Sequence, residues 1–414
     1  MAPLRPVRGT RDFLPEDSRR RRHVEEQALA IARRYNYGEV STPIFEFTEV
    51  FARTLGDTSD IVTKEMYTFE DRSGDRITLR PENTAGIVRA FLSNGLAQKL
   101  PVKVFYAGPM FRYERPQKGR LRQFHQVGFE SLGIADPAAD IELIVLGADF
   151  LAALGLDDRV VIEINSLGDA ASRDAYRACL VDYFGAHRER LSADSLARLE
   201  RNPLRILDSK DEADRAIVAT APAITDHLND ASRTFFDRVC GGLDHLGIRF
   251  RLNPRLVRGL DYYSHTTFEF VTEALGSQGT VLAGGRYDGL VEQMGGPATP
   301  GIGWAAGVER LMMLIDEPPA APRPIAVIPF GPDQAPAATA IARRLRGAGL
   351  ATEVSHTGSL GKALKWANRI NARAAVILGP EEMSRSAVTV RDMDAGSQGE
   401  VALNALEQHL ATAR

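Results

Sequence analysis

The chain has 414 residues, of which 44% are hydrophobic and 25% charged, and its formal net charge is −3. This length supports two or three domains with cores of their own and excludes a small scaffold held together by disulfides. With no long apolar run, no signal peptide, and Cys179 and Cys240 far apart, the sequence predicts a cytoplasmic protein without a membrane span or a structural zinc site.

The charge is unevenly distributed along the chain. Residues 323–414 contain 11 Lys/Arg and 8 Asp/Glu, a charge of +3 that leaves −6 for residues 1–322. A basic C-terminal part on an acidic body predicts an anionic partner for that part of the chain.

The N-terminal region predicts a helix over residues 16–36. Val24, Ala28 and Ile31 recur there at helical spacing between charged residues, so the helix is amphipathic. We interpret its Arg19–Arg22 run as a solvated face, with contact to nucleic acid as the less favoured alternative.

Residues 40–133 alternate with period two, and strands are predicted at 77–80, 104–106 and 124–129. Hairpin-like loops join neighbouring strands, which favours an antiparallel sheet and not a doubly wound parallel one. A second strand region follows at 250–271 and 279–283, with a helix over about 306–315.

The composition of the segments outside these strands divides the chain into domains. Residues 166–235 predict a mostly helical insertion, the Pro-rich run 316–324 contains a linker, and alternating strands and helices predict a small α/β domain after it. The predicted boundaries are therefore 1–165 and 236–318 for a divided sheet domain, 166–235 for the insertion, 319–324 for the linker and 325–414 for the last domain.

The segment 111–126 is a dense basic hairpin between two strands, which indicates binding of polyphosphate and ATP chemistry. Period-two alternation places Arg112 and Glu114 on one face of their strand, and Phe124, Gln126 and Glu130 on one face of the next. Cations, carboxylates and an aromatic ring on one face are better explained by a ligand than by solvent.

Two further segments carry polar groups beside turns. The same parity aligns Glu82 with Thr84 in a turn suited to an ammonium group, although a Glu after Pro is also typical of a helix start. Arg258 stands beside a Gly turn and Tyr262-Tyr263, where desolvation strengthens attraction for phosphate or carboxylate.

The glycine-rich segment 301–310 does not follow a parallel strand–helix unit, so we reject a dinucleotide fingerprint. Its glycines favour close packing of a strand on a helix, and Arg310 could lie over an adenine ring. In the last domain, four cations at offsets 0, 3, 7 and 11 indicate one helical stripe, which fits a solvated face and an RNA contact equally well: Lys362, Lys365, Arg369 and Arg373.

Together these segments resemble the bacterial-type class II histidyl-tRNA synthetases from residues 8–12 nearly to the C-terminus. The three class II motifs appear in order as the helix and strand ending at Pro43, the Arg112 hairpin and the turn at 307–310. The segments 256–263 and 282–289 are similar to the histidine-specific signatures of that family.

The resemblance implies an α+β fold: a six-stranded antiparallel catalytic sheet flanked by helices, a helical insertion and a C-terminal α/β anticodon-binding domain, in a homodimer. It implies ATP-dependent activation of L-histidine and transfer to histidine tRNA, with Mg²⁺ arriving with ATP and no metal site of the protein itself. It places histidine against Glu82, Thr84, Gln126, Glu130, Arg258, Tyr262, Tyr263 and Tyr287. It places ATP against Arg112, Glu114, Arg120, Phe124 and Arg310, with Arg112 and Arg258 as the catalytic cations.

One alternative shares the same core. The regulatory subunit of ATP phosphoribosyltransferase resembles these synthetases and binds histidine without charging tRNA. That class generally lacks the C-terminal domain and has degraded motifs, whereas residues 325–414, Arg112, Arg258 and Arg310 are all present here.

Overall fold

The computed structural model describes residues 3–412 except 56–60, 210, 258–261 and 358. The chain forms two compact units, Met1–Pro318 and Pro319–Arg414, and residues 316–324 between them carry neither helix nor strand. Among the described residues, no helix combines the length and the apolar character that crossing a membrane requires.

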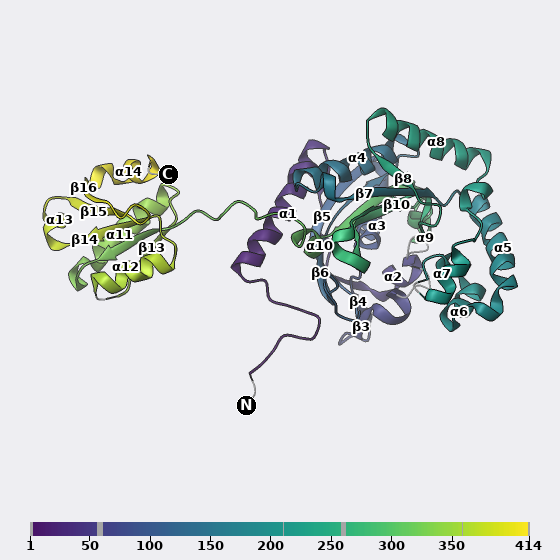
Figure 1. Ribbon diagram of the computed structural model, residues 1–414, viewed down its shortest axis with the longest axis horizontal. Helices are drawn as coiled ribbons and strands as arrows, with labels where there is room; N and C mark the ends of the chain where they lie inside the picture. The colour runs from purple at the N-terminus through teal and green to yellow at the C-terminus, as the bar shows by residue number, and fades with distance from the viewer. Residues whose placement is uncertain (1–2, 56–60, 210, 258–261, 358, 413–414) are drawn as a thin grey trace. The chain divides into compact units, whose positions relative to one another are not determined.

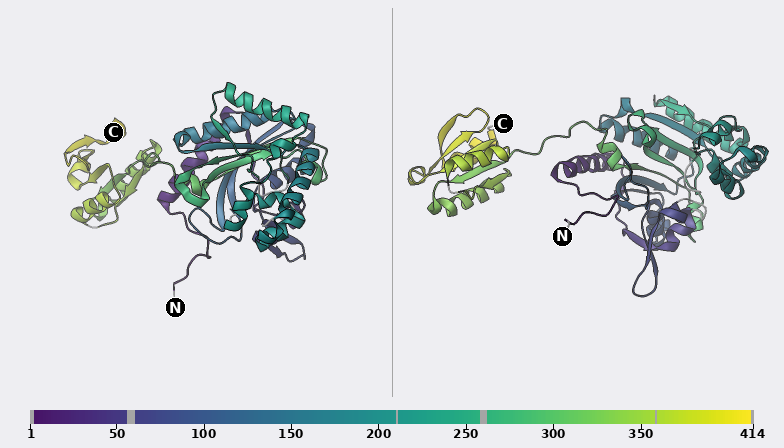
Figure 2. Two further views of the ribbon diagram at one scale, coloured as in Figure 1. Left: turned by 45° about the vertical axis from the view of Figure 1, so that its right-hand side comes forward. Right: turned by 60° about the horizontal axis from the view of Figure 1, so that its bottom comes forward.

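The first unit is built on one large sheet (Figures 1 and 2). Its strand order is β1-β5-β6-β11-β10-β9-β7-β8. The bounds are β1 Gly38–Glu39, β5 Val102–Phe111, β6 Gln123–Leu132, β11 Gly301–Gly307, β10 Thr280–Arg286, β9 Ser264–Val271, β7 Val161–Ser166 and β8 Phe250–Leu252.

The antiparallel prediction is confirmed for the six strands from β5 to β7, because every pair of neighbours within this group is antiparallel. The sheet has eight strands in all, however, because β1 and β8 add short parallel edges. These edge strands span two and three residues, too few to show a period of two in the sequence.

Helices cover one face of this sheet. They are α1 Pro15–Arg34, α4 Ala138–Ala153, α8 Asp230–His245 and the short α10 Val308–Met312. Ile31, Phe150 and Val239 from these helices pack with Phe129 and Trp304 of the sheet in one core. The predicted N-terminal helix is confirmed as α1, which has Pro15 in its first turn.

Two expectations for these helices were wrong. Arg19 and Arg20 are not a solvated face: Arg20 donates to the carbonyls of Met312 at 3.0 Å and Ile315 at 2.9 Å, and both arginines pair with Glu317. The predicted boundary after residue 235 also cuts through α8, whose later turns belong to the main core. A continuous helix does not reveal in its sequence which neighbour each turn contacts.

The other face carries α3 Thr84–Ser93, α2 Thr48–Leu55, α9 Leu290–Gln293 and a three-stranded antiparallel sheet. That sheet has the order β2-β4-β3, with β2 Phe45–Phe47, β4 Arg76–Leu79 and β3 Tyr67–Glu70. Alternation along β5 divides the two cores, since Phe105 faces the helical side and Val104 and Tyr106 face this one.

The insertion contains α5 Ala170–Ala186, α6 Ala193–Arg201 and α7 Glu212–Val218. A side-chain oxygen caps the start of each helix, from Asp169, Ser192 and Asp211 respectively. The buried Asp214 carboxylate accepts hydrogen bonds from three serine hydroxyls, and these hydrogen bonds hold its pKa at about 2 although burial opposes them.

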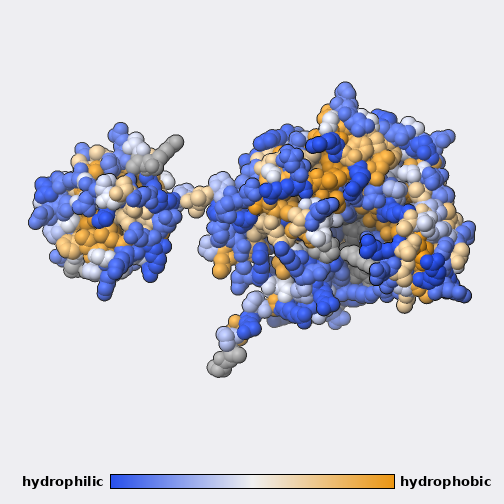
Figure 3. Space-filling view, viewed as in Figure 1, coloured by the Kyte–Doolittle hydropathy of each residue, from blue (hydrophilic) through white to orange (hydrophobic). Residues whose placement is uncertain are grey.

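The second unit has a five-stranded sheet of order β13-β12-β14-β15-β16. Its strands are β13 Thr352–Val354, β12 Ile325–Pro329, β14 Ala374–Leu378, β15 Ala387–Asp392 and β16 Gln398–Ala402. Alternate residues of β12 pack against α11 Ala335–Gly347 and α14 Leu406–Thr412 on one face and α12 Leu360–Arg369 on the other; α13 spans Pro380–Ser384. Hydrophilic residues cover most of the face of this unit that Figure 3 shows.

Candidate active site

A cavity in the first unit collects side chains from the start of α3, from β5 and β6 with the hairpin between them, and from β9, β10 and β11. Ten predicted residues line it: Glu82, Thr84, Arg112, Glu114, Arg120, Phe124, Gln126, Tyr262, Tyr263 and Arg310. Arg258 lies outside the described residues. Glu130 and Tyr287 are buried behind the lining.

Glu130 links the lining of the cavity to the layer behind it. It is fully buried on β6, where its carboxylate accepts hydrogen bonds from the Thr84 hydroxyl at 2.6 Å and the Tyr287 hydroxyl at 2.5 Å. Burial raises the pKa of the Glu130 carboxyl to about 8, while the hydrogen bonds from Thr84 and Tyr287 lower it and the nearby Glu82 charge raises it, each in smaller measure. Tyr287, which the sequence analysis assigned to histidine binding, therefore holds Glu130 and, like Glu130, is not among the residues that line the cavity.

Glycines make room for this arrangement. A Cβ atom at Gly303 on β11 would collide with the Glu130 carboxylate, and one at Gly128 on β6 would collide with the ring of Tyr106. Gly128 and Tyr106 face each other across the β5–β6 pair. The close approach of backbone and side chain here requires residues without a Cβ.

Glu82 has two roles available to it. Its carboxylate accepts hydrogen bonds from the backbone N–H groups of Thr84 at 2.7 Å and Ala85 at 2.9 Å, which satisfies the first turn of α3. The helix-start interpretation of this segment is therefore confirmed, while Glu82 also lines the cavity. Burial raises the pKa of the carboxyl, against the backbone hydrogen bonds and the charge of Arg112.

The basic hairpin differs from the expectation in one respect. β5 ends at Phe111, so Arg112 and Glu114 lie in the connection after it and do not alternate along a strand. The Arg112 Nε donates to the carbonyl of Pro81 at 2.9 Å, and its guanidinium lies 5.2 Å from the centre of the Phe124 ring. These contacts, which the sequence pattern could not supply, hold Arg112 against the cavity.

Arg120 and Arg310 close the opposite end of the cavity. Arg120 forms an ion pair with the buried Glu114. Arg310 donates to the carbonyls of Gly119 at 3.2 Å and Thr280 at 2.5 Å, so it ties the hairpin to β10. Burial, followed by the nearby Arg120 and Arg112 charges, lowers the pKa of Arg310. Clustered guanidinium groups create a site for an anion with several charges.

Two buried polar atoms in the lining have no hydrogen-bond partner among the described residues: the hydroxyl of Tyr106 and Oε1 of Gln126. Buried polar groups are normally paired, so these atoms mark where a ligand can bind. Sequence reasoning identified Gln126 but missed Tyr106. The signal for Tyr106 was its position opposite Gly128, which becomes visible only when the β5–β6 register is known.

Sequence reasoning also missed Glu309, which lines the cavity at the start of α10. Its carboxylate accepts hydrogen bonds from the backbone N–H of His125 at 2.9 and 3.0 Å and lies 2.9 Å from Nδ1 of that ring. It thereby fixes β6 beside Phe124. Among the residues that the structure describes, no cluster of His, Cys, Asp and Glu could hold a metal ion.

Comparison with known proteins identifies the family of the chain. The family model described as "Histidyl-tRNA synthetase" matches residues 9–311, and the model "Anticodon binding domain" matches residues 324–412. The chain belongs to the histidyl-tRNA synthetase family. It is 64% identical over 412 residues to the histidine–tRNA ligase of Rhodospirillum rubrum, with 99% of each chain covered, and 57% identical to that of Gluconacetobacter diazotrophicus, again with 99% of each covered.

A solved structure supports the same assignment. The apo histidyl-tRNA synthetase of S. aureus superposes with a TM-score of 0.83 at 34% identity, covering 98% of this chain and 99% of that one. The α+β fold expected for a histidyl-tRNA synthetase, with its C-terminal domain, is therefore confirmed.

In the C-terminal unit, the stripe of cations predicted from the sequence is shorter than expected. Lys362, Lys365 and Arg369 are exposed on α12, which ends at Arg369. Arg373 lies beyond the helix, is partly buried, and donates to the carbonyl of Leu410 at 2.6 Å. The expectation of four cations on one helix was therefore wrong for Arg373.

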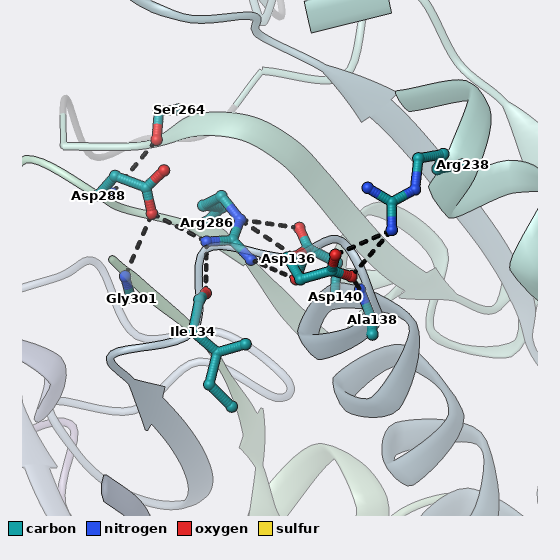
Figure 4. A network of polar contacts seen from close by, with 9 residues as sticks. All are labelled: Ile134, Asp136, Ala138, Asp140, Arg238, Ser264, Arg286, Asp288 and Gly301. Carbon is teal, nitrogen blue, oxygen red and sulfur yellow. Dashed lines mark hydrogen bonds and ion pairs between the residues drawn. The ribbon is translucent and has the colours of Figure 1, made fainter. Parts of the chain in front are cut away.

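A buried ion pair holds the segment around Tyr287, behind the cavity lining (Figure 4). Arg286 at the end of β10 pairs with Asp140 on α4, and both side chains are fully buried. Arg286 also donates to the carbonyl of Ile134 at 3.1 Å and to Asp288 at 3.0 Å, and Asp288 accepts from the backbone N–H of Gly301. The backbone on both sides of Tyr287 is thus held in place.

Proposed function

We propose that this chain activates L-histidine with ATP and transfers the histidyl group to the 3′ end of histidine tRNA. The observation that carries the proposal is one cavity that holds carboxylates and unpaired polar atoms at one end and three guanidinium groups at the other. Membership of the histidyl-tRNA synthetase family identifies the two ligands that suit such ends.

At the histidine end, Glu82, Thr84 and Gln126 bind the ammonium group. The Gln126 Oε1, which lacks a partner among the described residues, is a free acceptor for it. Glu130 and Tyr263 bond the two imidazole nitrogens. A site whose buried polar groups need both nitrogens discriminates against analogues that lack one by roughly 10⁴-fold.

At the ATP end, Arg112 binds the α-phosphate, and Arg120 and Arg310 bind the outer phosphates and the adenine. Phe124 stacks on the base and Glu114 lies near its amino group. Arg120 is paired with Glu114, so binding a phosphate oxygen requires it to exchange that carboxylate. Mg²⁺ enters as the ATP complex.

The first step is in-line attack of the histidine carboxylate oxygen on the α-phosphorus. A new O–P bond forms, the bond to the bridging oxygen breaks, and pyrophosphate leaves with its electron pair. Arg112, and Arg258 by the family resemblance, stabilise the charge that develops on the phosphorus oxygens. The adenylate then reacts with a terminal ribose hydroxyl of the tRNA, which releases AMP.

We also propose a homodimer and a cytoplasmic location. On the three-stranded sheet, Phe45, Phe47 and Phe69 are each about half exposed. Phe47 and Phe69 both pair with Ile77 of the middle strand, so they form a row across the sheet. An exposed apolar patch of this kind supports contact with a second copy of the chain.

The test is exchange of pyrophosphate into ATP, followed by charging of total tRNA. We expect exchange that requires histidine and a histidyl-tRNA product. Arg112→Ala should reduce the exchange rate by on the order of 10². A protein that binds histidine but supports neither reaction would instead be a histidine-binding regulator, a role that the complete C-terminal domain does not favour.

A further inference from the structure

The helical insertion contacts the histidine end of the cavity through α5. The Arg173 guanidinium on that helix donates from Nη1 to the backbone carbonyl of Tyr263 at 2.6 Å, and the contact is partly buried. Tyr263 itself lines the cavity. A side chain of the insertion therefore reaches the backbone of a residue that faces histidine.

The position of Tyr263 matters to the neighbouring aromatic rings. Its ring lies 4.6 Å from that of Tyr262, which lies 5.8 Å edge-on from that of Tyr287, and Tyr287 bonds Glu130. The Tyr263 ring also rests on Gly285 of β10, where a Cβ atom would come within 2.8 Å of it. A shift of the Tyr263 backbone would therefore disturb the whole imidazole end.

The junction around Arg173 is tightly bonded. The start of the insertion and His265 exchange two backbone hydrogen bonds. The Leu167 N–H donates to the His265 carbonyl at 2.7 Å, and the His265 N–H donates to the Gly168 carbonyl at 2.8 Å. Before the tyrosines, the Arg255 guanidinium donates to the carbonyl of Ala219, just past α7, at 2.5 Å. The insertion thus contacts the residues on either side of Leu256–Tyr262.

We infer that Arg173 is a positioning residue, through which the insertion sets the affinity of the site for histidine. The inference rests on the proposed function for the identity of the ligand. A charge-assisted hydrogen bond that is partly shielded from water can fix a carbonyl in this way. Among the described residues, Arg173 has no hydrogen bond to the hairpin or to α10, where ATP is proposed to bind. The effect should therefore fall on histidine and spare ATP.

The experiment compares Arg173→Ala, Arg173→Lys and Arg177→Ala in the full chain. Arg177 lies one turn further along α5, and its guanidinium donates to the carbonyl of Arg201 inside the insertion, so it is the matched control. We expect Arg173→Ala to raise the KM for histidine about tenfold, which corresponds to about 1.4 kcal/mol. The KM for ATP should stay within about twofold, Arg173→Lys should recover part of the loss, and Arg177→Ala should match the wild type.

Calorimetric titration with histidine alone separates this inference from the proposed function. Weaker histidine binding by Arg173→Ala supports the positioning role even if the wild type fails to exchange pyrophosphate, a failure that would overturn only the proposed function. Equal histidine affinity in Arg173→Ala and wild type overturns the inference. So does a parallel rise of both KM values with a lower unfolding midpoint, because that pattern marks a purely structural contact.

Discussion

At the scale of single residues, Glu130 is a buried carboxyl with a raised pKa behind the cavity lining. The carboxyl is fully buried and its pKa is raised to about 8, mainly by burial. In the ligand-free site it therefore holds a proton below about pH 8, whereas an imidazole N–H is best accepted by the ionised form. The proposed contact between Glu130 and the imidazole would therefore link binding of histidine to loss of that proton.

We predict that kcat/KM for histidine rises with pH up to an apparent pKa near 8, because the ionised fraction of Glu130 rises over that range. Glu130→Gln should remove this component of the profile and reduce kcat/KM by on the order of 10². The ratio of variant to wild type, measured from pH 6 to 9, isolates Glu130, since the substrate itself titrates identically in both. A ratio that does not change with pH would contradict the assignment.

Tyr287→Phe offers a matched control, because it removes one hydrogen bond that lowers the pKa of Glu130. We expect its pH profile to move to higher pH without losing the dependence on pH.

In the protein without bound histidine, the raised pKa of Glu130 also affects stability with a defined sign. The folded state binds an extra proton between about pH 4.3 and about pH 8, so this group's contribution to the free energy of unfolding falls as pH rises.

At the scale of elements, the Arg286–Asp140 pair joins β10 to α4 inside the protein. Removing one partner of a buried pair leaves the other charge without compensation. We predict that Arg286→Ala lowers the free energy of unfolding by about 3–5 kcal/mol in urea titration. Arg238→Ala, which breaks the exposed pair with Asp136 in the same network, should cost less than about 1 kcal/mol. Similar losses in the two variants would contradict this distinction.

The sequence predicted elements that have a clear period or strong turn signals. Hydrophobic periodicity predicted the N-terminal helix and the antiparallel strands. The clustering of charged residues predicted the polar residues of the hairpin. The edge strands β1 and β8 are too short for a period, and the end of β5 at Phe111 depends on tertiary contacts of Arg112. Tyr106 and Glu309 required the register of β5 and the packing of α10, which one sequence does not contain.

At the scale of the whole molecule, the C-terminal unit presents Lys362, Lys365 and Arg369 on α12, while α11 carries three other cations on the opposite face of the sheet. If α12 contacts tRNA phosphates, each contact adds about 0.7–0.9 to the salt slope of binding. We predict that changing the three α12 cations to Gln lowers this slope by about 2 and leaves pyrophosphate exchange unchanged.

The matched control changes Arg343, Arg344 and Arg346 on α11 to Gln, which removes the same charge. Its salt slope should stay near that of the wild type. Equal slopes for the two triple variants would favour the alternative that the α12 stripe is only solvated.

The exposed row on the three-stranded sheet gives a prediction for assembly. Phe47→Glu should convert a dimer into a monomer in sedimentation velocity, since a carboxylate would have to be buried in the interface. Leu246→Glu is the comparison, because Leu246 is 55% exposed at the end of α8 and lies outside that sheet. A wild-type protein that sediments as a monomer would rule out the dimer.

The glycines packed against Glu130 and Tyr106 restrict how the proposed histidine site could be redesigned. At Gly303 and Gly128 any added methyl group meets Glu130 or Tyr106, so neither position can be used alone to reshape the pocket for a foreign amino acid. A protein engineer would have to shorten Glu130 or Tyr106 first and only then substitute the glycine behind it. Paired libraries at these positions should therefore yield functional variants where single-site libraries do not.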